Sequence, residues 1–138
     1  MRLRFALWLV LLVATVGCGA GRDSPEHVVR AWSDAVNAGD NERAADLFSP
    51  GAEVVQGNAV LRLHTHREAV AWNAGLPCSG TIVSLEHDGD EVTVTFVLGD
   101  RKSSRCDGPG GKTTALIVVR HGKIVLWHQT GSQPGAIA

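Results

Sequence analysis

Two histidines that could carry out chemistry, His64 and His66, are separated by one residue. Residues two apart on a β-strand point to the same face, so this pair could present two imidazoles to one metal ion. However, Thr65 begins the pattern Thr-x-x-Glu with Glu68, which is typical of a capping box at a helix start. Because no third ligand lies nearby, we expect a helix start here, with no bound metal or other cofactor.

Two further motifs could indicate an active site. The acid Asp34 could act as a base if it faced a pocket, but it lies between Trp32 and Val36, which define the apolar face of a helix. The stretch GPGGKTT, residues 108–114, ends like a phosphate-binding loop, but Cys106 stands where that motif has its first glycine. We therefore assign no catalytic residue and no nucleotide site to these motifs.

The first 21 residues, MRLRFALWLVLLVATVGCGAG, are typical of an export signal. Their apolar run, residues 5–16, falls short of the roughly 20 residues that a membrane span needs. The segment TVGC resembles the bacterial lipobox, in which a small residue precedes a cysteine that is lipidated, although Thr15 replaces the usual aliphatic residue. We predict a signal peptide over 1–17 and a lipidated Cys18 followed by a tether to residue 23, which makes the protein a cell-envelope lipoprotein. Secretion after ordinary signal cleavage is the alternative.

Export would place the two remaining cysteines, Cys78 and Cys106, in an oxidising compartment. They lack the CxxC spacing of a redox or zinc motif. An isolated pair in an oxidising compartment usually forms a disulfide, so we predict one here.

Length and composition limit the class of protein. The chain has 138 residues, of which 44% are hydrophobic, and this allows one globular domain. The formal net charge is -1 and no block of like charge stands out, which excludes a typical nucleic-acid binder. We place the domain at residues 24–131 and a disordered tail at 132–138. Membrane contact is expected only through the N-terminal lipid.

Patterns of apolar residues and caps predict three helices followed mainly by strands. The first helix runs from Ser24 to Gly39, the second starts at Asp40 and stops at Pro50 and Gly51, and the third follows Thr65. The strands are expected at residues 52–56, 59–63, 82–87, 91–98, 114–120 and 123–130. The strand at 91–98 alternates apolar and polar residues, which indicates one buried face, and Asp88 and Gly89 are expected at the centre of a hairpin turn.

Two segments carry a resemblance to a known family. The stretch VVRAWSDAVNAGDNERAADLFSPGAEVV, residues 28–55, resembles the opening of nuclear-transport-factor-2-like proteins of the SnoaL-like group, and HGKIVLWHQ, residues 121–129, resembles their closing strand. The resemblance implies an α+β fold in which a strongly curved antiparallel sheet wraps around about three N-terminal helices. Such a cone has a pocket at its wide end, and its convex sheet face often forms homodimers. Members include isomerases, dehydratases, cyclases and epoxide hydrolases, as well as binding modules, so the fold alone does not define a function.

The resemblance also bears on the site. Isomerase-like members place a catalytic Asp at about Gln56, a second acid within 114–117 and a tyrosine on the first helix, but this chain has no acid at these positions and no tyrosine. By analogy with the family, Trp127 and Gln129 on the last strand line the cone. The candidate pocket residues are Trp32, Val36, Trp72, Val94, Phe96, Trp127 and Gln129. They would form either an apolar pocket or a filled core.

These observations favour a lipid-anchored SnoaL-like domain that binds an apolar small molecule or a protein partner without catalysis. The alternative is a SnoaL-like enzyme of isomerase or hydrolase type that uses Asp34, His64 or His66 in the pocket.

Overall fold

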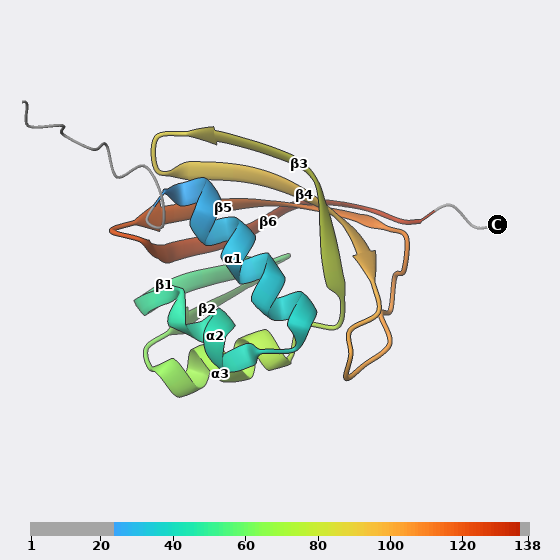
Figure 1. Ribbon diagram of the computed structural model, residues 1–138, viewed down its shortest axis with the longest axis horizontal. Coiled ribbons are helices and arrows are strands. Elements are labelled where there is room, and N and C mark those ends of the chain that lie inside the picture. The colour runs from blue at the N-terminus through green and yellow to red at the C-terminus, as the bar shows by residue number, and fades with distance from the viewer. Residues whose placement is uncertain (1–23, 136–138) are drawn as a thin grey trace, which may run out of the picture.

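The structure is a computed structural model that describes residues 24–135, and these form three helices and one six-stranded sheet (Figure 1). The elements are α1 (Pro25–Ala38), α2 (Asn41–Asp46), β1 (Phe48–Gln56), β2 (Ala59–Leu63), α3 (His66–Ala74), β3 (Ser79–Asp88), β4 (Glu91–Gly99), β5 (Lys112–Arg120) and β6 (Lys123–Gln133). The strand order is β2-β1-β6-β5-β4-β3. The predicted α+β class is confirmed, but the sheet is mixed, because β1 and β6 run parallel. The predicted signal peptide and lipidated Cys18 lie outside the described residues.

Helix α1 crosses the concave face of the sheet (Figure 1). Its start follows the prediction, since the Ser24 side chain accepts a hydrogen bond from the His27 amide and Pro25 occupies the first turn. Its end does too, because Gly39 takes the left-handed conformation at φ 74°. The buried side chains of α1 include Val29 and Trp32, which join the hydrophobic core. Within residues 24–135, no helix is long and apolar enough to cross a membrane.

Helices α2 and α3 pack together beside β1 and β2 (Figure 1). The predicted capping box is present: the Glu68 amide donates to Thr65 Oγ1 at 3.2 Å, and the Thr65 amide donates to Glu68 Oε2 at 3.1 Å. The predicted end of the second helix is wrong, because Pro50 and Gly51 lie inside strand β1. Proline is tolerated there because β1 pairs with β2 only from Ala52 onward, and its pairing with β6 is interrupted over the same residues.

The β3–β4 hairpin differs from its predicted register by one residue. Asp88 pairs with Glu91, so Gly89 and Asp90 are the central turn residues. Gly89, at φ 57°, takes the first central position, where a type II′ turn needs a positive φ. The alternation predicted for β4 is confirmed by the burial of its inward residues, which are Val92, Val94 and Phe96.

The C-terminal strand is longer than predicted. Strand β5 begins at Lys112 rather than at residue 114, so β6 gains partners as far as Gln133, which pairs with Lys112. The domain therefore extends past residue 131, and the predicted tail at 132–138 is wrong for its first two residues.

Candidate functional site

A cavity of about 490 Å³ lies between α1, the curved sheet and the loop that connects β4 to β5. Five of the candidate pocket residues line it, namely Trp32, Val36, Phe96, Trp127 and Gln129. The other lining residues are Ser33, Asn37, Gln56, Leu76, Pro77, Cys78, Ser79, Gly80, Leu98, Asp107, Gly108, Thr113 and Ser132. The cavity wall is therefore a mixture of aromatic, aliphatic and small polar groups.

The remaining two candidates, Trp72 and Val94, lie outside the lining. Val94 is fully buried in the core. Trp72 stacks against Trp32, with ring centroids 6.4 Å apart, and its ring meets Trp127 edge-on at 5.2 Å. A filled core and an open cavity are thus both present, because side chains fill the inner part of the cone and the cavity lies beyond them.

The two tryptophans of the cavity wall differ in their polar contacts. Trp32 Nε1 donates to Asn73 Oδ1 at 2.8 Å, and Asn73 in turn donates to the Ala69 carbonyl at 2.9 Å. Trp127 Nε1 is buried and has no hydrogen-bond partner among residues 24–135. An unpaired buried donor costs free energy, so Trp127 is held by the packing of its ring.

Strand β3 is fixed to α1 by Asn37. Its side-chain amide donates to the Gly80 carbonyl at 2.8 Å, and its side-chain oxygen accepts from the Gly80 amide at 2.9 Å. A Cβ at Gly80 would lie 3.0 Å from Phe96, so only glycine fits without a shift. Sequence analysis missed this contact, because nothing local to Asn37 marks the residue as a partner of a strand 43 residues away.

The loop between β4 and β5 is held by a buried arginine that sequence analysis also missed. Arg101 Nη1 donates to the carbonyls of Asn73 at 2.6 Å and Leu76 at 2.9 Å, and Nη2 donates to Asn41 Oδ1 at 2.8 Å. Burial lowers the pKa of Arg101 from its ordinary value. The guanidinium satisfies carbonyls at the end of α3, where a cation is favourable. This role is structural, since Arg101 does not line the cavity.

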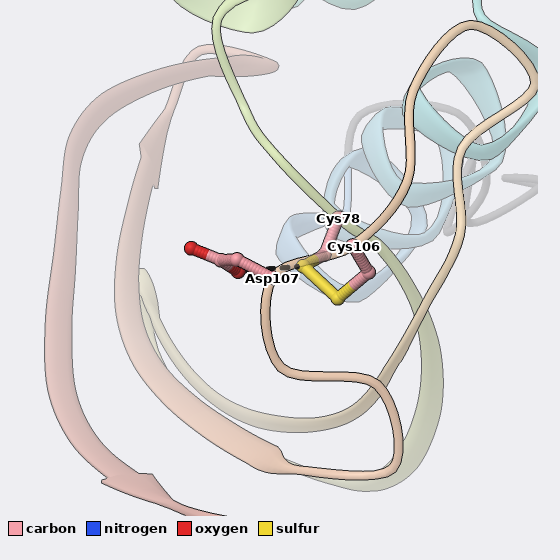
Figure 2. A group of neighbouring side chains, drawn as sticks. All are labelled: Cys78, Cys106 and Asp107. Carbon is pink, nitrogen blue, oxygen red and sulfur yellow. Dashed lines mark hydrogen bonds between the residues drawn. A yellow bond between two sulfur atoms is a disulfide. The ribbon is translucent and has the colours of Figure 1, made fainter.

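The predicted disulfide between Cys78 and Cys106 is present (Figure 2). Its Cys78 lines the cavity. Cys106 is also held by its amide, which donates to Asp100 Oδ1 at 2.8 Å. The next residue, Asp107, has its Oδ1 3.3 Å from Cys78 Sγ, a contact drawn as a dashed line in Figure 2. A disulfide sulfur carries no proton, so this is a sulfur–oxygen contact. Both thiols are used in the disulfide, so these three residues do not make a thiolate metal site.

Asp107 is the one charged side chain of the cavity lining within the described part of the chain. Sequence analysis missed it, because it lies in a polar loop without a recognisable motif. Gln56 also lines the cavity, so an amide stands where the resemblance implies a catalytic acid in isomerase-like members.

The catalytic candidates of the alternative hypothesis lie elsewhere. Asp34 is exposed on α1, and His64 is exposed before α3. His66 Nε2 lies 2.8 Å from Glu42 Oε2, so this exposed histidine links α3 to α2. None of the three lines the cavity.

The chain belongs to the SnoaL-like domain family, whose sequence pattern matches residues 29–127. No curated protein matches the chain in sequence.

Solved structures share its fold at low sequence identity. An NTF2-like protein of unknown function from Cytophaga hutchinsonii has a TM-score of 0.65 and 10% identity, covering 80% of this chain and 91% of that one. A protein called a polyketide cyclase, from Sinorhizobium meliloti, has a TM-score of 0.58 and 20% identity over 75% of this chain and 93% of that one. A Catenulispora acidiphila protein with a ketosteroid isomerase-like fold, in complex with trimethylamine, has a TM-score of 0.61 and 19% identity over 75% and 84% of the two chains.

Proposed function

We propose that this SnoaL-like domain binds a small, largely apolar molecule in its cavity without transforming it. The observation that carries the proposal is the cavity itself: about 490 Å³ of space, walled by two indoles, a phenyl ring and aliphatic side chains, with scattered polar groups. Small-molecule sites in proteins have this size and composition. The complex of the Catenulispora acidiphila protein with trimethylamine supports the view that this fold can hold a small molecule.

The composition of the lining favours binding over catalysis. General acid–base chemistry needs a positioned proton donor or acceptor, usually one whose surroundings tune it. Asp107 is the one ionisable side chain that faces the cavity from residues 24–135, and it is exposed to solvent. Gln56 cannot act as a general base. The position of these two residues supports a binding site.

A calorimetric titration tests this proposal. Phenylbutanol, a neutral and mostly apolar probe, should bind the purified chain with its disulfide intact. Leu98→Trp should abolish binding, because Leu98 lines the cavity and the larger ring would fill it. Leu116→Trp is the matched control, since Leu116 is half-buried on β5 and does not line the cavity. Failure of phenylbutanol to bind, or equal binding to Leu98→Trp, would contradict the proposal.

A SnoaL-like enzyme is the second candidate function, and Asp107 at the cavity is the observation that favours it. The two candidates differ in the fate of the ligand. A molecule that copurifies with the chain and is recovered unchanged after prolonged incubation supports binding. Conversion that is lost in Asp107→Asn would identify an enzyme.

We further propose that the protein is exported and anchored by a lipid on Cys18. The disulfide supports export, because disulfides persist mainly in oxidising compartments. The apolar run and TVGC support cleavage and lipidation. Labelling with a radioactive fatty acid in a bacterial host should mark the chain, and Cys18→Ser should remove both the label and the membrane association. A Cys18→Ser chain that stays in the membrane fraction would overturn the lipid anchor.

A further inference from the structure

We infer that the ligand of this cavity carries an organic ammonium group on an apolar body. The inference rests on the proposed binding function and specifies the charge of the ligand. Three properties of the cavity support it: the sign of its charge, its aromatic walls and the free carboxylate in its lining.

The charge of the cavity disfavours anionic ligands and favours cationic ones. Asp107 is the one charged residue of the lining in the chain from 24 to 135, and no lysine, arginine or histidine of that segment lines the cavity beside it. A carboxylate or phosphate ligand would therefore meet a like charge and no cation. An ammonium group would meet an opposite charge.

The aromatic wall provides a second attraction for a cation. The ring centroids of Phe96 and Trp127 both lie 6.0 Å from that of Trp32, and both rings meet it edge to face. A cation close to the face of an indole or phenyl ring is attracted by the ring quadrupole, and tryptophan is the best of these partners. The same rings also cover the apolar body of the ligand.

The carboxylate of Asp107 is available for this contact. Among residues 24–135 it makes no ion pair, and its one close polar contact is with the sulfur of Cys78. The backbone next to it is held by the neighbouring disulfide and by the hydrogen bond from the Cys106 amide to Asp100. This backbone therefore needs little ordering when a ligand arrives.

Gln129 adds a neutral acceptor. It lines the cavity from β6, is half-buried, and its side chain makes no hydrogen bond with another described residue. Its amide oxygen can accept an N–H bond from the ammonium, as Asp107 can.

Three probes with the same carbon skeleton test the inference: phenylbutylamine, phenylbutanol and phenylbutyrate, which are cationic, neutral and anionic near neutral pH. Calorimetry on the intact, oxidised chain should show that the amine binds about tenfold more tightly than the alcohol, and that the acid binds most weakly. In Asp107→Asn the amine should lose this advantage, while binding of the alcohol should change little. Asp34→Asn, which removes the same charge from an exposed site outside the cavity, is the control and should keep the preference.

The outcomes separate the inference from the function on which it rests. If the alcohol binds as tightly as the amine, or if Asp107→Asn keeps the preference for the amine, the ammonium inference fails and the binding function stands. If none of the three probes binds, both fail. A tighter complex with phenylbutyrate would overturn the inference by showing that the cavity selects anions.

Discussion

Trp32 Nε1 donates a hydrogen bond of 2.8 Å to Asn73 Oδ1, and this bond joins the cavity wall on α1 to the interior of α3. Asn73 is fully buried, so its side-chain oxygen has no access to water. The indole of Trp32 is therefore held by a polar contact as well as by its aromatic neighbours.

This contact predicts that two similar substitutions differ in cost. Trp32→Phe should destabilise the fold by about 1–3 kcal/mol more than Trp127→Phe, because it leaves Asn73 Oδ1 buried without a donor. Trp127→Phe loses no hydrogen bond and removes the unpaired indole N–H. Urea unfolding followed by circular dichroism measures both. Equal losses of stability would mean that the Trp32–Asn73 bond contributes nothing net.

Arg101 should be among the most sensitive positions of the loop. Arg101→Met should lower the free energy of unfolding by about 2–3 kcal/mol, because the carbonyls of Asn73 and Leu76 lose a charged donor. Arg101→Lys should not restore the loss, since one ammonium cannot replace both nitrogens of the guanidinium. Arg105→Met, an exposed position in the same loop, should change stability by about 0.5 kcal/mol or less. Equal effects of the Arg101→Met and Arg105→Met substitutions would contradict the anchoring role.

The disulfide should stabilise the fold chiefly by fixing this loop. Reduction, or the double substitution Cys78→Ser and Cys106→Ser, should lower the free energy of unfolding by about 2–4 kcal/mol. The reason is that the unfolded chain is then no longer cross-linked between two residues 28 apart. Hydrogen exchange should rise at residues 100–111, and a reductant should have no further effect on the double variant. Unchanged exchange in this loop on reduction would show that Arg101 alone holds it.

Gly80 should tolerate no side chain. Gly80→Ala places a Cβ 3.0 Å from Phe96. It should lower the free energy of unfolding by about 1–3 kcal/mol, the usual range for overpacking. Gly108→Ala is the control, because a Cβ there meets nothing within 4 Å. Thermal unfolding compares the two variants, and similar melting temperatures would indicate that Phe96 can shift to make room for the added Cβ.

Local signals in the sequence predicted much of this fold. The caps at Ser24 and Thr65 and the terminating Gly39 each depend on neighbours within four residues, so the sequence is enough to find them. The alternation in β4 likewise reports burial directly. The hairpin register failed by one residue, because Asp-Gly and Gly-Asp are both good turn pairs and DGD contains each of them.

The site was less predictable, for a physical reason. Trp32, Phe96 and Trp127 could be proposed because large aromatic residues at inward positions must face the core or a cavity. In the sequence alone, nothing distinguishes Asp107 and Arg101 from the other polar residues of their loop. Their roles come from partners on α2, on α3 and in the segment between α3 and β3, and no spacing along the chain encodes those contacts.

The parallel pairing of β1 with β6 has a consequence for how this protein is made. The two strands are neighbours in the sheet, although β2, α3, β3, β4 and β5 separate them along the chain. Until β6 is synthesised, β1 and β2 have no connection through the sheet to β3, β4 and β5. The sheet therefore closes only after the last strand has emerged, and such long-range closure is slow. A chain whose β6 has not yet emerged cannot complete its hydrophobic core, because Ile124 and Trp127 lie on that strand.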